Sequence, residues 1–362
     1  MGRRRLPTND FRVTETAASA SISLSQALRR LAQGGSLSAL EAAAAFGVVM
    51  RGEATGPEIA ALLLALRSKG ESAEEIAGAA AALRAAMVPL VTEETDRLVD
   101  TCGTGGGSLT TLNISTAAAF VVAGAGIPVA KHGNRSYTSR AGSADVLEAM
   151  GIDIVTAPEQ APGVLKEARI VFLFAPSYHP AMRHVGPTRR ELGVPTIMNL
   201  VGPLANPAGV RRQVVGVADS SRGPCLADAL CRLGATHALV VHGVVGMDEI
   251  SPVGETMVWE IRDGRVSEWT LDAAELGFGW DSLDGLAGGE PSENAARIER
   301  LLRTGEGGAE RVAVLLNAAA ALYVSGAGWS FPEAARRAQV ALESGAGAGA
   351  LDRLRAAAPR QR

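Results

Sequence analysis

Glycine and hydroxyl residues gather near residue 100 in a pattern that suits the binding of an anion. The stretch Asp100-Thr-Cys-Gly-Thr-Gly-Gly-Gly-Ser108 is closely followed by Asn113-Ile-Ser-Thr116. Glycine lets backbone N–H groups approach a phosphate, and the first turn of a helix adds unpaired N–H groups and the positive end of its dipole. Thr111 and the polar side chains of the second stretch can complete such a site. A plain glycine-rich turn is the alternative, because short glycine motifs also occur without a ligand.

Several common catalytic and nucleotide-binding motifs are absent from the sequence. No Gly-Lys-Ser/Thr follows the glycines, so the loop is not a Walker A loop. No acidic residue closes a strand about 20 residues further on, which makes it a poor dinucleotide-binding fingerprint. The five histidines show no zinc-binding spacing, and the chain lacks the GxSxG pattern of a serine hydrolase.

A second polar segment, Lys131-His-Gly-Asn-Arg-Ser136, follows a short apolar run. It brings two cations, an imidazole and an amide together. At the carboxyl end of a parallel strand these groups would face the crevice in which α/β proteins bind ligands. A basic surface turn is the alternative, but the nearby glycine loop favours an anion site. Further along, Ser143 can either cap a helix or contact a phosphate, and the two roles are compatible.

Adjacent carboxylates, Asp248 and Glu249, follow a strongly apolar run that ends near residue 241. Magnesium is commonly held by one or two carboxylates together with phosphate oxygens and water. A solvated acidic turn is the alternative, but the glycines before the pair and the anion loops elsewhere favour a metal site. Arg189 and Arg190 belong to a segment rich in arginine and histidine, and an arginine there can clamp a carboxylate with two hydrogen bonds. Arginines on helices are more often solvent-exposed surface residues.

These groups need elements to position them, and the first part of the chain is predicted to be helical. We expect a poorly ordered tail at residues 1–21 and a small helical domain of about four helices at residues 22–92. Three capping boxes precede alanine- and leucine-rich amphipathic stretches in this domain, namely Ser38-x-x-Glu41, Thr55-x-x-Glu58 and Ser72-x-x-Glu75.

Short apolar runs alternate with helical segments over residues 93–356, which predicts an α/β domain with a mainly parallel central sheet. The segment at about 180–195 is expected to pack back on the helical domain. The expected strands are residues 98–102, 128–131, 152–155, 170–174, 196–198, 214–218 and 238–241. The expected helices are residues 115–123, 143–150, 161–168, 225–233, 309–324 and 332–343. Residues 255–261 and 265–271 are typical of an antiparallel hairpin, whereas residues 277–308 give no clear prediction.

Composition excludes several classes of protein. The 362 residues include 35 basic and 38 acidic side chains, for a formal net charge of −3, and only 4% are aromatic. A broad basic surface or a stacking platform for nucleic acid is therefore not expected. The apolar runs are much shorter than the roughly 20 residues that span a membrane. Three cysteines without a CxxC motif and an N-terminus without an apolar signal segment fit a cytoplasmic protein.

Taken together, the motifs resemble the anthranilate phosphoribosyltransferase family from about residue 24 to residue 355. The motifs that carry the resemblance are the loop at residues 103–106, Asn113-Ile-Ser-Thr, Lys131-His-Gly-Asn-Arg-Ser, Gly142-Ser-Ala-Asp-Val-Leu-Glu, His179-Pro-Ala-Met-Arg, Gly202-Pro-Leu-Ala-Asn-Pro and Asp248-Glu249. Nucleoside phosphorylases with a helical and an α/β domain share parts of this pattern. The resemblance implies transfer of a phosphoribosyl group from PRPP (5-phosphoribosyl 1-diphosphate) to the amino nitrogen of anthranilate in tryptophan synthesis. It also implies the use of Mg²⁺ and a homodimer joined through the helical domains.

The resemblance also implies roles for individual residues, with no covalent nucleophile on the protein. PRPP would be bound by Gly103, Gly106, Thr111, Asn113, Ile114, Ser115, Thr116, Lys131, His132, Gly133, Asn134, Arg135, Ser136, Tyr137, Thr138, Ser139 and Ser143. Anthranilate would be bound by Gly103, Asn134 and Arg189, the last through its carboxylate. Ser115 and Glu249 would contact one Mg²⁺, and Asp248 and Glu249 a second.

The chain departs from the family pattern in the glycine loop. Gly107 and Ser108 stand where the family usually has Asp-Gly, Leu112 where Phe is usual, and Val245 where Asp is frequent. A missing carboxylate could alter the metal dependence, the activity or the acceptor. Two alternatives therefore stay open, namely a phosphoribosyltransferase for another aromatic acid in specialised metabolism and a non-catalytic relative that binds nucleic acid. The net charge argues against the second alternative.

Overall fold

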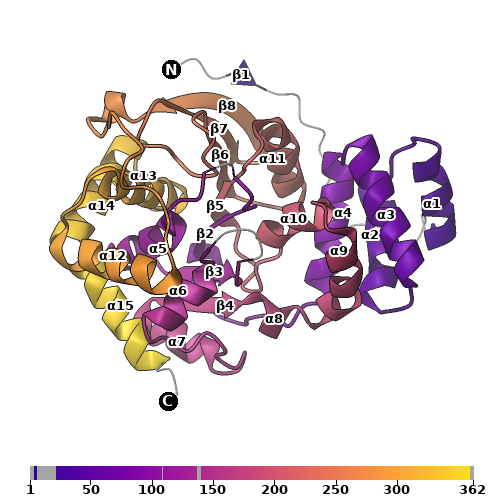
Figure 1. Ribbon diagram of the computed structural model, residues 1–362, viewed down its shortest axis with the longest axis horizontal. Coiled ribbons are helices and arrows are strands. Elements are labelled where there is room, and N and C mark those ends of the chain that lie inside the picture. Colours follow the sequence, from indigo (N-terminus) through magenta and orange to yellow (C-terminus); the bar gives the residue numbers. More distant parts are fainter. Residues whose placement is uncertain (1–3, 6–21, 108, 137–139, 359–362) are drawn as a thin grey trace.

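Four helices form the N-terminal part of the computed structural model, which describes residues 4–5, 22–107, 109–136 and 140–358 (Figure 1). These helices are α1 (Leu24–Ala32), α2 (Ala39–Met50), α3 (Gly56–Lys69) and α4 (Ala73–Ala85). The three predicted capping boxes are confirmed, since the hydroxyls of Ser38, Thr55 and Ser72 accept hydrogen bonds from the backbone of Glu41, Glu58 and Glu75. A fourth box at Ser23 begins α1.

A mainly parallel sheet, as predicted, forms the centre of the remaining chain. Its strands are β1 (Arg4–Arg5), β2 (Val99–Gly103), β3 (Val129–Gly133), β4 (Ile170–Phe174), β5 (Arg212–Gly216), β6 (His237–Gly243), β7 (Glu255–Arg262) and β8 (Arg265–Asp272). They lie in the order β1-β8-β7-β6-β5-β2-β3-β4. Strands β2 to β6 are parallel, and β7 and β8 form the predicted antiparallel hairpin. The predicted tail lies outside the described residues except at β1, which pairs antiparallel with β8.

Helices cover both faces of the sheet (Figure 1). One hydrophobic core lies under a group of helices that pack on one face. These helices are α5 (Ile114–Gly124), α6 (Ser143–Ala149), α7 (Ala161–Ala168), α12 (Pro291–Thr304), α13 (Ala309–Val324), α14 (Phe331–Glu343) and α15 (Ala346–Ala357). A second core joins α10 (Ile197–Val201) and α11 (Gly223–Arg232) on the other face to the four N-terminal helices. The N-terminal helices therefore share one continuous core with the sheet.

Short helices link these layers. They are α8 (Ala175–Tyr178), α9 (Gly186–Leu192) and the 3-10 turns η1 (Thr95–Arg97), η2 (Pro180–His184), η3 (Gly202–Leu204), η4 (Ser220–Arg222) and η5 (Ala274–Leu276). Within residues 180–195, η2 contacts α2 and α9 contacts α3. The described residues contain no helix that combines the length and the apolar character needed to cross a membrane.

Two predicted strands are wrong. Residues 197–198 begin helix α10 instead, with Thr196 as the N-cap, and the Asn199 side chain accepts the backbone N–H of Thr196 at 3.1 Å. Residues 152–155 lie outside the strands, although the side chains of Ile152 and Ile154 are buried in the core. The backbone N–H of Asp153 donates instead to the carbonyl of Ala358, near the end of the described chain. Short apolar runs do not distinguish a buried strand from other buried segments. Helix α12 lies within residues 277–308, for which no clear prediction was possible.

Candidate functional site

Four neighbouring parallel strands end in glycine at one edge of the sheet, at Gly103, Gly133, Gly216 and Gly243. The chain runs from β2 to β3 on one side, whereas β5 lies on the other side of β2. This reversal of strand order is where open α/β sheets bind ligands. The loops after β2, β3 and β6 carry the polar residues that the sequence singled out, so the structure places them at this edge.

Lys131 lies on β3 and is buried. Its side chain reaches the start of α5. Its Nζ donates to the carbonyl of Thr101 at 2.6 Å and lies 3.4 Å from Ser115 Oγ. Burial lowers the pKa of Lys131, while the nearby carboxylate of Asp100 acts in the opposite direction. Lys131 is thus a cation held beside the N-terminus of a helix, which is an arrangement that favours anions.

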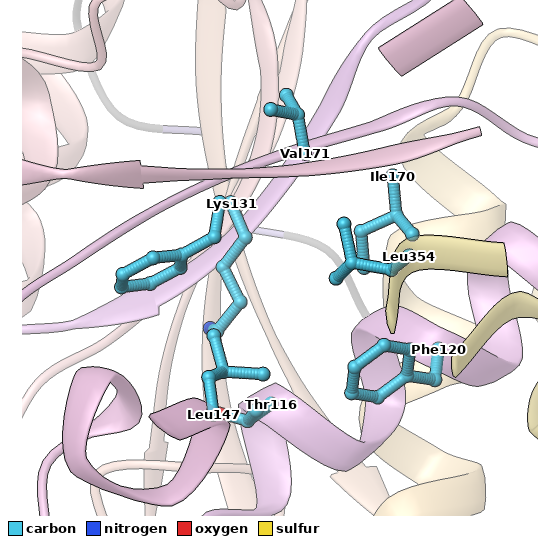
Figure 2. Close-up of a pocket in the computed structure, with 8 residues that line it drawn as sticks. Thr116, Phe120, Lys131, Leu147, Ile170, Val171 and Leu354 are labelled. Carbon is cyan, nitrogen blue, oxygen red and sulfur yellow. The ribbon is translucent and has the colours of Figure 1, made fainter. Parts of the chain in front are cut away.

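The aliphatic part of Lys131 lines a narrow apolar pocket between β3, β4 and α5. Figure 2 shows the side chain extending from β3 toward Thr116 of α5, with Leu147 beside it. The hydroxyl of Thr116 is buried and has no hydrogen-bond partner among the described residues. Thr116 therefore contributes to the packing around Lys131, and so does Phe120, which lines the same pocket.

The negative charge of Asp100 interacts with the positive charge of Lys131, and sequence reasoning missed this role of Asp100. Its carboxylate is fully buried and accepts hydrogen bonds from Asn206 Nδ2 at 2.8 Å and from the backbone N–H of His132 at 3.3 Å. Burial raises the pKa of Asp100, and the charge of Lys131 opposes that rise. Because Asn206 is 106 residues from Asp100 in sequence, spacing alone could not have paired them.

The two acidic residues face the glycine loop and α5. Glu249 Oε1 accepts the backbone N–H of Ser115 at 3.0 Å, and Oε2 accepts the Thr111 hydroxyl at 3.3 Å. Burial raises the pKa of Glu249, and the neighbouring Asp248 raises it further; burial also raises the pKa of Asp248. A Cβ on Gly107 would lie 3.3 Å from Asp248 Oδ1. Ionisation of both carboxyl groups is therefore unfavourable in the protein alone, and a bound cation would favour it.

The loop after β3 is held by acidic residues of α6. Arg135 forms ion pairs with Asp145 and Glu148, and Asp145 Oδ2 accepts the backbone N–H groups of Ser136 at 3.2 Å and Gly142 at 2.9 Å. The positive charge of Arg135 is therefore paired with carboxylates of the protein itself. Helix α6 begins at Ser143 with Gly142 as its N-cap, so the prediction of Ser143 as the capping residue is wrong.

The side chains of Asn113 and Ile114 pack against other residues of the protein and do not point into an open site. The Asn113 amide donates to the carbonyl of Ala141 at 3.0 Å and accepts from Asn294 Nδ2, on α12, at 3.0 Å. The side chain of Ile114 is fully buried. These two residues hold the loops together, and Asn294 is a supporting residue that no local motif marked.

His132 is neutral in this environment. Burial lowers the pKa of His132 to about 3 and that of its neighbour His179 to about 4. Their rings pack 5.0 Å apart. His132 therefore adds no positive charge to the anion site near neutral pH.

Arg189 lies on α9, beside the N-terminal helices. Its Nη2 donates to Asn199 Oδ1 at 3.4 Å. Direct contacts thus join Thr111, Ser115, Lys131 and Glu249 into one network. The hydrogen bond from Arg189 to Asn199 is not part of that network. Among the other predicted residues, Tyr137, Thr138 and Ser139 lie outside the described residues, as does Ser108 of the glycine loop.

Comparison with known proteins gives consistent matches over both parts of the chain. Residues 25–87 match a helical bundle domain of the glycosyl transferase family, and residues 95–348 match the a/b domain of that family. The anthranilate phosphoribosyltransferase of Rubrobacter xylanophilus is 50% identical over 91% of this chain and 96% of its own length. That of Methanosarcina acetivorans is 48% identical over 88% of this chain and 85% of its own.

Solved structures match as well. Anthranilate phosphoribosyltransferase from Thermus thermophilus superposes with a TM-score of 0.86 at 43% identity, covering 91% of this chain and 98% of the other. The Saccharomyces cerevisiae enzyme in complex with PRPP and Mg superposes with a TM-score of 0.83 at 28% identity, covering 92% and 97%. The same yeast enzyme in complex with 4-fluoroanthranilate gives a TM-score of 0.82 at 26% identity, covering 94% and 98%.

Proposed function

Because this chain belongs to the family of anthranilate phosphoribosyltransferases, we propose that the strand-end site around Lys131 binds PRPP and presents it to anthranilate. The reaction transfers the phosphoribosyl group to the amino nitrogen of anthranilate in tryptophan biosynthesis. The bond from C1 of the ribose to pyrophosphate breaks, a bond from C1 to nitrogen forms, and the amine loses a proton. The products are N-(5-phosphoribosyl)anthranilate and pyrophosphate.

The contact network of Lys131, Ser115 and Glu249 is the observation that carries the proposal. It places a buried lysine and a buried carboxylate each in contact with Ser115, at the N-terminus of a helix. PRPP carries several negative charges, and this combination matches the charges of both the sugar phosphate and its metal. We propose that the backbone N–H groups of the loops after β2 and β3 supply further donors. Residues that already bond to the protein, such as Arg135 and Asn113, would then act mainly by shaping those loops.

The residues present fit Mg²⁺, which is bound together with PRPP in a solved structure of the Saccharomyces cerevisiae enzyme. Asp248, Glu249 and the Ser115 hydroxyl are oxygen donors, the type of ligand that Mg²⁺ prefers. The described residues contain no group of three or more His, Cys, Asp or Glu that could hold a metal, so the remaining ligands would be substrate oxygens and water. When bound, Mg²⁺ would neutralise charge on the departing pyrophosphate. We propose two ions for each site, one shared by Ser115 and Glu249 and one by Asp248 and Glu249.

The protein contributes orientation and electrostatics. Negative charge grows on the leaving group as C1 becomes oxocarbenium-like, and the ammonium of Lys131 and the amides of α5 are fixed in place before the reaction begins. Holding the amine of anthranilate against C1 would supply much of the rate enhancement. No covalent intermediate on the protein is needed.

A direct assay tests the proposal. Anthranilate is fluorescent, so incubation with PRPP and Mg²⁺ should produce a loss of anthranilate fluorescence that depends on both additions. Turnover of a different aromatic acid but not of anthranilate would favour a specialised phosphoribosyltransferase. Failure with every acceptor, together with salt-sensitive binding of nucleic acid, would favour a non-catalytic relative.

Arg189 is proposed to clamp the anthranilate carboxylate, with Gly103 and Asn134 lining the same acceptor site. Substituting Arg189 with alanine should raise the KM for anthranilate about 10- to 100-fold, because a hydrogen-bonded charge pair is lost. The KM for PRPP should change little. Arg190→Ala is the matched control, because Arg190 is the next residue on α9 and is exposed. Steady-state kinetics in both substrates measure the split, and an equal rise in both KM values would contradict the assignment.

The glycine loop provides a second prediction, about the metal. Gly107→Asp would place a carboxylate against Asp248, because a Cβ there lies 3.3 Å from Asp248 Oδ1. The added ligand charge should lower the Mg²⁺ concentration for half-maximal activity by roughly an order of magnitude. Gly107→Asn, which is similar in size and uncharged, is the control. If the Mg²⁺ titrations of the two variants superimpose, the carboxylate has no part in metal binding.

Two features of the family stay predictions for this chain. We propose that two copies associate through α1 to α4, as the family resemblance implies. We also propose a cytoplasmic location, which fits an enzyme of amino-acid biosynthesis. Analytical ultracentrifugation tests the first, and a monomer at micromolar concentration would contradict it.

A further inference from the structure

Asn317 lies on α13, outside every motif that the sequence singled out. The residue is 5% exposed, and its side chain makes three hydrogen bonds. Its Oδ1 accepts the backbone N–H of Ile250 at 3.1 Å, and its Nδ2 donates to the carbonyl of Ile250 at 3.0 Å and to that of Ala313 at 2.9 Å. The amide therefore satisfies both backbone groups of the residue that directly follows Asp248 and Glu249.

The type of residue at this position is specific. Only a side-chain amide offers an acceptor and a donor side by side in the way that a neighbouring strand does. A carboxylate has no hydrogen to donate when ionised, and an apolar side chain has neither group. Asn317 thus bonds to Ile250 with a donor and an acceptor, as a neighbouring backbone would, and fixes the acidic turn from the side of α13.

Asn317 also lies next to the proposed metal ligands. A narrow internal space beneath the glycine loop is lined by Ser115, Asp248, Glu249 and Asn317. On the opposite side the turn presses on Gly216, where a Cβ would lie 1.6 Å from the backbone oxygen of Asp248. The backbone of the acidic pair is therefore held between α13 and the end of β5.

We propose that Asn317 is a positioning residue for Mg²⁺, because it fixes the backbone from which both carboxylates project. The proposal rests on the proposed function, since it concerns the same metal site. Mutation of groups that orient metal ligands through hydrogen bonds usually weakens metal affinity by about 10- to 100-fold. The effect should fall on the metal and the pyrophosphate part of PRPP, and not on anthranilate.

The test uses Asn317→Ala and Asn317→Leu, with Tyr323→Phe as a matched control. Tyr323 lies on the same helix and donates a buried hydrogen bond to Glu260 at 2.7 Å, so its loss destabilises α13 without touching the acidic turn. Mg²⁺ binding is measured by isothermal titration calorimetry in the presence of saturating pyrophosphate. Thermal unfolding of each variant is recorded alongside.

We expect both Asn317 variants to bind Mg²⁺ at least about tenfold more weakly than the wild type. Tyr323→Phe should bind Mg²⁺ as the wild type does, even if its Tm falls by as much as the Tm of the Asn317 variants. In steady-state kinetics the KM for anthranilate should stay unchanged in all variants. If the Asn317 variants bind Mg²⁺ as tightly as Tyr323→Phe does, the positioning role is overturned while the proposed function stands. If the wild type binds no Mg²⁺ with pyrophosphate, the proposed metal site and this inference both fail.

Discussion

Substituting Glu249 with glutamine is expected to lower kcat/KM about 10²- to 10³-fold, comparable to the loss of a key electrostatic group in other enzymes. The carboxylate of Glu249 accepts hydrogen bonds from both Ser115 and Thr111, and glutamine can keep only one of these acceptors. The substitution also removes a charge from the pair that we propose holds Mg²⁺. Steady-state kinetics over a range of Mg²⁺ concentrations measure the loss.

The control for this prediction is Glu255→Gln. Glu255 lies just after the same turn, at the start of β7, and is exposed to solvent. Its substitution should leave activity close to that of the wild type. Activity of Glu249→Gln that returns to the wild-type level at high Mg²⁺ would assign Glu249 to metal affinity alone. Full activity at every Mg²⁺ concentration would contradict its place in the site.

A second large effect is expected from Gly216→Ala. A Cβ at this position would lie 1.6 Å from the backbone oxygen of Asp248, which is far inside van der Waals contact. Either β5 or the acidic turn must move, so we expect the unfolding free energy to fall by about 1–3 kcal/mol, as for overpacked cores. The displaced carboxylates should also reduce kcat/KM by about 10²-fold, because misplaced catalytic groups are costly.

Gly163→Ala is the matched control for the steric argument. Gly163 lies within α7, and a Cβ there would meet no atom within 4 Å. Alanine in a helix interior is favoured over glycine by roughly 0.5–1 kcal/mol, so this variant should be as stable as the wild type or slightly more stable. Chemical denaturation and the fluorescence assay compare the two. An active, stable Gly216→Ala protein would show that the acidic turn does not depend on this close approach.

Local patterns in the sequence were sufficient to predict the strand ends and the loops that follow them. Glycine at the end of β2 and β3, the capping boxes and the polar motifs are all short-range signals. The elements that failed, residues 152–155 and 196–198, are short apolar runs whose conformation depends on partners elsewhere in the chain. Asp153, for example, bonds to Ala358.

The supporting residues of the site could not be predicted for a related reason. Asn206, Asn294 and Asn317 contact Asp100, Asn113 and Ile250 across 106, 181 and 67 residues of sequence. Each is an ordinary asparagine by type, and only the fold reveals its partner. The residues that we propose to contact substrate could therefore be selected from motifs, whereas the groups that hold those residues in place could not.

The most direct test of the site is a crystal structure of the protein with PRPP and Mg²⁺. We predict the pyrophosphate next to Lys131 and the N-terminus of α5, with metal density in contact with Asp248 or Glu249. PRPP bound at another surface, or metal density away from both carboxylates, would contradict the assignment of this edge of the sheet as the catalytic site.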